Sequence, residues 1–343
     1  MENLKLAHQN AKKGKGWYKE VKMVDSDPEK YLKELQDMLI NKTYNTSEYE
    51  TFIKKDGGKE RLIYKLPYFP DRICQWAILQ VIEPIILKTL TDDTYSAIPK
   101  RGIHLCLKKV THAMQTDVPG CQFCLKLDAR KYYPSIDHDI LKRKYRHLFK
   151  DDDLLWLLDE IIDSTPGDTG IPIGNYISQY SGNFYLSSFD HWIKEVKHVK
   201  HYFRYMDDIV IFGETKEGLH KLKKEIDEYF RKELKLEVKG NWQVFPSYVR
   251  GVDFVGYRIF MNFKLLRKST CKQMKKKLNR INKHRLEGRT MTYSEWCSVN
   301  SYKGWLIHCD SFRLQQKYIA PVQKYADAYY QFKIKNKKGG KVI

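Results

Sequence analysis

The chain has 343 residues, enough for two or three domain-sized units, and 42% of them are apolar, so a sizeable core can form. Its formal net charge is +20, from 62 Lys and Arg against 42 Asp and Glu, which favours a polyanionic partner. Residues 263–343 hold 20 Lys and Arg against 4 Asp and Glu, which is +16 of that total. This concentration argues against a generically basic protein and indicates a surface for a phosphate backbone.

The cysteine pattern and the absence of long apolar runs bear on where the protein works. Seven cysteines without framework spacing predict thiols in a reducing compartment. Cys121-x-x-Cys124 is a lone pair, and a zinc site would need two more ligands, so zinc is disfavoured. Neither a charged-then-apolar leader nor a run of 18 apolar residues is present, so we expect a cytoplasmic protein with no membrane partner.

The N-terminal part predicts helices and one hairpin. Residues 1–40 are polar, with apolar residues at helical spacing, and predict a helical lead-in. Residues 50–55 and 59–64 flank Asp56-Gly57-Gly58, and this arrangement predicts a β-hairpin. A Pro-containing break follows, and a helix is predicted over residues 71–90.

A strand is predicted next over residues 123–128. Its alternation places Phe123, Leu125 and Leu127 on one face, and Cys124, Lys126 and Asp128 on the other. The strand therefore ends at Asp128, with this carboxylate away from the core. A helix over residues 141–162 and a loop over residues 165–170 are predicted after it.

A second pair of carboxylates lies between two short strands. Residues 201–204 and 209–213 are aromatic and β-branched, and they flank Tyr205-Met206-Asp207-Asp208, which predicts a tight hairpin. Adjacent acids repel each other and are poor strand formers. A solvated turn is one explanation, and a bound cation, Mg²⁺, is the other.

Asp128 favours the cation. Together with Asp207 and Asp208 on neighbouring strands, it would form a cluster of three carboxylates. Two Mg²⁺ ions about 3.5–4 Å apart could bind there, one activating a 3′-hydroxyl and one holding a pyrophosphate leaving group. This is the chemistry of nucleotidyl transfer.

The remaining elements are an amphipathic helix over residues 219–234 and strands over residues 241–244 and 254–259. A basic helix over residues 272–285 and an aromatic one over residues 296–305 follow. Lys335 to Lys341 is predicted to be a flexible basic tail.

Three segments of the chain resemble motifs A, B and C of reverse transcriptases, in the same order and at similar spacing. They are Asp128–Pro134, Gly170–Gln179 and Tyr205–Asp208, and the resemblance extends from about Gly57 to about Gln331. It implies an α+β right-hand polymerase, with an antiparallel palm sheet carrying helices on one face and a helical thumb. The expected division is fingers over 1–115, palm over 116–262, with 141–168 returning to the fingers, and thumb and tail over 263–343. No ribonuclease H, maturase or endonuclease segment is expected in the remaining length.

The resemblance also implies residue roles. Asp128, Asp207 and Asp208 are the expected catalytic metal ligands, together with the carbonyl of Ala129. The residues expected at the nucleotide are Arg61, Arg72, Tyr133, Ile173, Gly174 and Gln179, and those of the primer grip are Gly256 and Tyr257. Arg61 and Arg72 would hold the triphosphate, and Tyr133 would exclude ribonucleotides by pressing on the sugar. A solvated hairpin remains an alternative for Arg61, and a core aromatic for Tyr133.

Motif B indicates a subfamily. Ile173-Gly174-x-x-x-Ser178-Gln179 departs from retroviral and group II intron enzymes, which generally carry Gln before the Gly and Ser-Pro at the end. It resembles diversity-generating retroelement reverse transcriptases, which copy with errors chiefly at template adenines. Ile173 cannot form hydrogen bonds through its side chain, so it cannot hold the nucleotide as Gln would. The implied partners are a template RNA, the cDNA/RNA duplex, dNTPs and an oligomeric basic accessory protein, in a bacterium or its phage.

Other functions stay open at this point. An antiphage or abortive-infection reverse transcriptase would share the same chemistry. A catalytically silent RNA-binding protein would not need all three carboxylates, and an RNA-dependent RNA polymerase is disfavoured by Tyr133.

Overall fold

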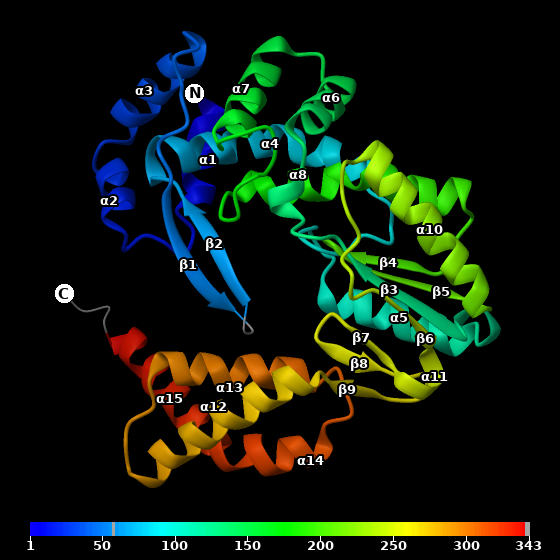
Figure 1. Cartoon of the computed structure of the whole chain (residues 1–343). Helices are drawn as coiled ribbons and strands as arrows, with labels where there is room; N and C mark the ends of the chain where they lie inside the picture. The colour runs from blue at the N-terminus through cyan, green and yellow to red at the C-terminus, as the bar shows by residue number, and fades with distance from the viewer. Residues whose placement is uncertain (57–58, 340–343) are drawn as a thin grey trace. The chain divides into compact units, whose positions relative to one another are not determined.

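The computed structural model describes residues 1–56 and 59–339 (Figure 1). These residues divide into two compact units, each built from segments that are distant in sequence. Unit 1 comprises Met1–Gly102 and Leu125–Val244, and unit 2 comprises Ile103–Cys124 and Phe245–Ile343. The expected division into fingers, palm and thumb stays a prediction. None of the described helices is long and apolar enough to span a membrane.

The N-terminal half of unit 1 is mainly helical, as predicted. Its helices are α1 (Glu2–Ala11), α2 (Lys19–Ser26), α3 (Pro28–Ile40) and α4 (Ile73–Lys88). Helix α3 begins with Pro at its first turn, and the side chain of Asp27 caps it by accepting from the Lys30 amide at 3.2 Å. Buried Leu4, Ala7 and Ala11 form the apolar face of α1, which packs on α4.

The predicted hairpin is present. Strands β1 (Glu50–Asp56) and β2 (Lys59–Lys65) pair antiparallel, with Glu50 opposite Lys65 and Lys54 opposite Arg61. The two glycines of the predicted turn, Gly57 and Gly58, lie outside the described residues.

A four-stranded sheet carries the predicted acidic residues. Its strands are, in spatial order, β4 (Tyr202–Tyr205), β5 (Asp208–Gly213), β3 (Phe123–Asp128) and β6 (Gln243–Pro246). Strand β3 has the predicted bounds, with Leu125 and Leu127 buried. Cys124, predicted to point away from the core, is also fully buried, because both faces of the sheet are covered at this level. Helix α10 (Lys216–Glu233) contributes Leu219, Ile226 and Phe230 to the core.

The helix predicted over residues 141–162 is wrong as a single element. The structure has α6 (His138–Leu148) and α7 (Asp152–Asp163), because Asp151 starts a new helix by accepting from the Leu154 amide at 2.8 Å. Helices α8 (Tyr176–Tyr185) and α9 (Ser187–His191) follow the motif B loop.

Unit 2 contains a small sheet and a group of helices. The sheet has the order β7 (Val252–Phe254), β8 (Tyr257–Ile259) and β9 (Lys264–Leu266). The helices are α5 (Ile103–Thr116), α11 (Ser247–Arg250), α12 (Lys268–Leu286), α13 (Tyr293–Leu306), α14 (Phe312–Leu314) and α15 (Ala320–Gly339).

Two predictions for unit 2 need correction. Residues 254–259 do not form one strand, because Val255 and Gly256 have φ values of 43° and 85° and reverse the chain between β7 and β8. The predicted flexible tail over 335–341 is helical as far as Gly339, where α15 ends, and residues 340–343 lie outside the described residues.

Candidate active site

The three predicted catalytic carboxylates lie at adjacent ends of two neighbouring strands. Asp128 is the last residue of β3, and Asp208 is the first residue of β5. Tyr205 pairs with Asp208, so Met206 and Asp207 form a two-residue turn between β4 and β5. Because β3 and β5 are adjacent in the sheet, this turn brings Asp207 against Asp128.

The turn is held by a buried arginine that the sequence did not indicate. Met206 has a φ of 59°, which non-glycine residues seldom adopt. Arg204 is fully buried and donates from Nη1 to the Met206 carbonyl at 3.0 Å. Its Nε and Nη2 donate to the two carboxylate oxygens of Asp190 at 2.7 and 2.5 Å. This bidentate pair fixes the guanidinium, which in turn fixes the backbone next to Asp207.

The three carboxylates lie close together, and lysines lie beside two of them. Burial, together with hydrogen bonding to Asp128 and its charge, raises the pKa of Asp207 to about 7. The Lys126 ammonium lies 3.3 Å from Asp208 Oδ1, and that of Lys239 lies 3.8 Å from Asp128 Oδ2. The two ammonium groups thus offset part of the repulsion among the three acids.

The donor set suits a divalent cation. Asp128 Oδ1 is buried and has no hydrogen-bond partner among the described residues, although a buried carboxylate oxygen normally has one. Mg²⁺ prefers oxygen ligands of this type. Within the described chain, no group of three or more His, Cys, Asp or Glu side chains is already arranged as a metal cage.

Two further predicted residues lie beside the cluster. The hydroxyl of Tyr133 approaches the Met206 sulfur at 3.4 Å, in the turn that carries Asp207. Burial raises the pKa of Tyr133 above its usual value, with the Asp207 charge adding to this effect. Ala129 is buried and forms an isolated bridge with Val238.

A second group of predicted residues surrounds a pocket of about 200 Å³ in unit 1. Arg72 and Gly174 both line it, together with Ile63 and Tyr64 of β2. Gly174 has a φ of +136°, and a Cβ there would lie 2.0 Å from the Tyr64 carbonyl oxygen. The Ile173 carbonyl accepts from the Tyr64 amide at 2.8 Å. The motif B loop is therefore tied to the hairpin by a contact that only glycine allows.

Arg61 and Gln179 are less constrained than the residues of this pocket. Both side chains are exposed. The Arg61 charge opposes the rise in the pKa of Tyr133, so it acts on the same region as the acidic cluster.

Gly256 and Tyr257 belong to unit 2. A Cβ on Gly256 would lie 2.4 Å from the Trp305 ring, so this glycine is needed for packing against α13. Tyr257 is buried, and its hydroxyl donates to the Trp305 carbonyl at 2.9 Å. Their expected contact with a primer stays a prediction.

Sequence reasoning missed Arg204, Asp190 and Lys126. An arginine between aromatic residues of a short strand was the available signal for Arg204, because a charge in such a position must be exposed or paired. Lys126 was assigned to the same strand face as Asp128, but its pairing with Asp208 depends on the order of the strands.

Comparisons with known proteins agree with this geometry. The family described as "Reverse transcriptase (RNA-dependent DNA polymerase)" matches residues 53–259. Protein YkfC of Escherichia coli K12 is 24% identical over 271 residues, covering 66% of this chain and 71% of that protein. The group II intron-encoded protein LtrA of Lactococcus lactis is 22% identical over 177 residues, covering 49% of this chain and 29% of that protein.

A solved structure gives the same fold. Apo telomerase from Candida tropicalis aligns with a TM-score of 0.50 at 12% identity, covering 90% of this chain and 64% of that one. The chain thus spans less than two thirds of the telomerase chain and less than one third of LtrA. The likeness concerns the fold alone, and it confirms the predicted mixed architecture of antiparallel sheet and helices.

Proposed function

The chain belongs to the reverse transcriptase (RNA-dependent DNA polymerase) family, and we propose that it copies a template RNA into cDNA within a diversity-generating retroelement. The observation that supports polymerase activity most directly is the meeting of Asp128, Asp207 and Asp208 at the ends of β3 and β5. Members of this family generally use divalent metal ions, and the buried, unsatisfied Asp128 oxygen fits such an ion.

In the proposed mechanism, Asp128, Asp207, Asp208 and the Ala129 carbonyl would hold two Mg²⁺ ions. When bound, these ions activate the primer 3′-hydroxyl and neutralise charge on the leaving pyrophosphate. The protein holds the carboxylates in place through the clamp of Arg204 on Asp190 and Met206. The Lys126 ammonium, 3.3 Å from Asp208 Oδ1, offsets part of the negative charge of this cluster.

The incoming nucleotide is proposed to bind between the hairpin and the motif B loop. Arg72 and Gly174 line one pocket, which supports a shared role in holding the triphosphate and the base pair. Arg61 would add a second guanidinium, and exposed Gln179 a polar contact. Tyr133 lies against the turn of Asp207, where a ring can press on the sugar 2′ position.

The rest of the chain is proposed to hold nucleic acid. Residues 1–115, 116–262 and 263–343 would act as fingers, palm and thumb, with Gly256 and Tyr257 near the primer strand. The charge of +16 over residues 263–343 supports contact with the phosphates of a cDNA/RNA duplex. An oligomeric basic accessory protein is proposed to join the complex.

Error-prone copying at adenines is proposed to arise at Ile173. Its backbone is fixed by the 2.8 Å hydrogen bond from the Tyr64 amide, whereas its side chain offers no hydrogen bond to a nucleotide. A substitution to Gln would therefore add a polar contact without disturbing the backbone bond.

Primer extension on an RNA template tests this proposal. With Mg²⁺ and all four dNTPs, wild type should extend, with substitutions concentrated opposite adenine. Ile173→Gln should reduce those substitutions, and Asp207→Ala should abolish extension. Ile173→Val is the matched control, because it stays apolar and should keep the error pattern.

Other results separate the alternatives. Faithful extension by wild type would remove the diversification role and favour the antiphage reverse transcriptase, which shares the chemistry. If extension failed even with the accessory protein and its template RNA, the polymerase activity would be refuted and a silent RNA-binding protein favoured.

A further inference from the structure

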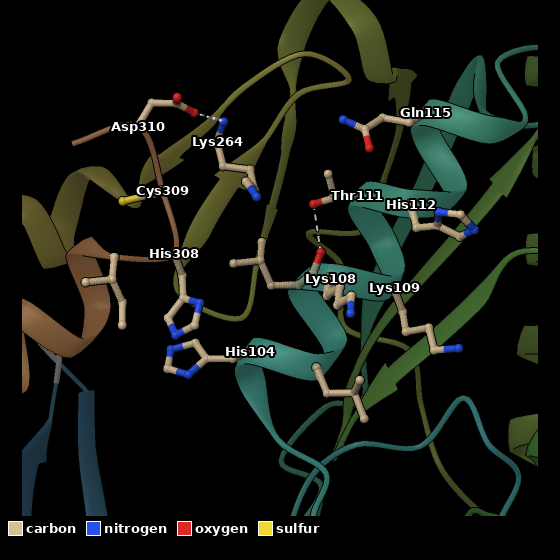
Figure 2. Close-up of a pocket in the computed structure, with 13 residues that line it drawn as sticks. His104, Lys108, Lys109, Thr111, His112, Gln115, Lys264, His308, Cys309 and Asp310 are labelled. Atoms are coloured by element: carbon tan, nitrogen blue, oxygen red, sulfur yellow. Dashed lines mark hydrogen bonds between the residues drawn. The ribbon is translucent and has the colours of Figure 1, made fainter. Parts of the chain in front are cut away.

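Unit 2 contains a pocket of about 1000 Å³ that the proposed polymerase chemistry does not use. One wall is a face of α5, on which His104, Lys108, His112 and Gln115 recur at helical spacing. The opposite wall is Lys264 of β9 and the segment from Ile307 to Asp310 that follows α13. Figure 2 shows these side chains along the two walls.

The pocket is cationic. Lys108, Lys109 and Lys264 form no ion pair with any described residue, whereas lysines of unit 1 such as Lys142 and Lys235 are paired with carboxylates. The Asp310 carboxylate accepts from the backbone amide of Lys264 at 2.8 Å (Figure 2), so the pocket lining holds one carboxylate against three ammonium groups. Three ammonium groups are therefore available to an anion.

The pocket also offers flat rings. His104 and His308 stack with centroids 3.7 Å apart and planes 27° from parallel. Burial and the neighbouring His308 lower the pKa of His104, which favours the neutral ring. Trp305 and Tyr257 contact His104 edge-on and fix its orientation. Exposed Ile307 extends this surface beside the stack.

We propose that this pocket binds a single-stranded segment of RNA, with phosphates on Lys108 and Lys264 and a base on the His104–His308 stack. Cations combined with stacking rings are how proteins hold single strands, whose bases are free to stack. Lys108 lies one turn from both His104 and His112, so cationic and ring groups alternate about every 6 Å along α5. The identity of this strand as template RNA rests on the proposed function.

Fluorescence anisotropy of a labelled 12-nucleotide oligouridylate with the full chain tests the proposal. Each phosphate contact contributes about 0.7 to the salt slope for a single strand. Lys108→Ala/Lys264→Ala should lower that slope by about 1.4 and weaken binding about 25-fold at 0.1 M salt. Lys221→Ala/Lys224→Ala is the matched control, since both lysines are exposed on α10 and the charge change is equal.

The stacking part has its own test. His308→Ala should weaken oligouridylate binding by at least about 5-fold with an unchanged salt slope, because a stacking ring is lost and the lysine contacts to phosphate stay in place. Circular dichroism should show that each variant keeps the wild-type melting temperature within a few degrees. An RNA duplex of equal length should compete poorly.

Three results would overturn the inference. They are equal binding by the pocket and control variants, equal competition by the duplex, and tighter binding of an acidic peptide than of the oligouridylate. Failure of wild type to extend, with pocket-dependent binding intact, would refute the proposed function and leave this inference standing.

Discussion

Replacing the buried partners Arg204 and Asp190 separates the stability of the fold from the positioning of Asp207. Both side chains have no exposed surface, and the guanidinium makes a bidentate contact with the carboxylate. Removing one partner leaves a buried charge uncompensated, which typically costs about 3–5 kcal/mol. We therefore expect Asp190→Leu and Arg204→Met each to lower the free energy of unfolding by about that amount.

The double variant should behave differently. Replacing a buried ion pair by apolar side chains of similar volume is often neutral or stabilising. Tyr202 and Thr94 also contact Asp190, at 2.5 and 3.1 Å, so we expect recovery to within about 2 kcal/mol of wild type rather than full recovery. The polymerase rate should stay low, because no donor then holds the Met206 carbonyl at the turn. A misplacement of about 1 Å can cost about 100-fold.

Urea denaturation and single-turnover nucleotide incorporation measure the two effects on the same samples. Stability recovery without recovery of rate would support the clamp. A double variant as unstable as the sum of the singles would refute the ion-pair reasoning. A double variant with the wild-type rate would refute the positioning of the turn by Arg204.

Three further predictions concern other parts of the site. Gly174→Ala should raise the KM for dNTPs and lower the unfolding free energy by more than about 1–3 kcal/mol, because its Cβ would collide with the Tyr64 carbonyl oxygen. Gly167→Ala is the control. This glycine also has a positive φ but lies in open space, so its substitution should lower the unfolding free energy only by the cost of backbone strain. If Gly174→Ala and Gly167→Ala had equal effects on the unfolding free energy in urea and on the KM for dNTPs, the close contact at Gly174 would be contradicted. Tyr133→Ala should admit ribonucleotides, measured as the ratio of kcat/KM for NTP and dNTP, whereas Tyr133→Phe should not; an unchanged ratio in the Ala variant would remove its role. Because burial raises the pKa of Asp207 to about 7, its proton must leave before Mg²⁺ binds, so the half-saturating Mg²⁺ concentration should rise by up to about tenfold per unit as pH falls below 7; a flat profile from pH 8 to 6 would contradict this.

Local patterns predicted the elements that carry the acidic residues. The alternation over residues 123–128 gave the bounds of β3, and the aromatic flanks of Met206 and Asp207 gave the β4–β5 hairpin. Both patterns involve residues that are neighbours in sequence, so these strands could be predicted from the sequence alone. The break between α6 and α7 was also readable in principle, because Asp151 precedes two further acids at a helix start. The turn at Gly256 gave a similar signal within a strand-like segment.

Features that depend on tertiary packing could not be predicted in this way. Arg204 is buried because Asp190, on a different element, satisfies it. The steric need for Gly174 comes from Tyr64, which is 110 positions earlier in the chain. The cationic pocket of unit 2 joins His104 to His308, and no local spacing relates these residues. Periodicity reports which face of an element is buried, but not which distant side chain it meets.

The most direct test of the central claim is single-turnover dNTP incorporation on an RNA template, measured for wild type and Asp128→Asn across a Mg²⁺ titration. Asparagine keeps the size of the side chain but removes the charge whose buried oxygen lacks a hydrogen-bond partner among the described residues. Metal ions supply several kcal/mol of stabilisation to such reactions, so the variant should be slower by about 10³-fold or more at every Mg²⁺ concentration. Incorporation by Asp128→Asn at the wild-type rate, or wild-type incorporation that does not depend on Mg²⁺, would contradict the account.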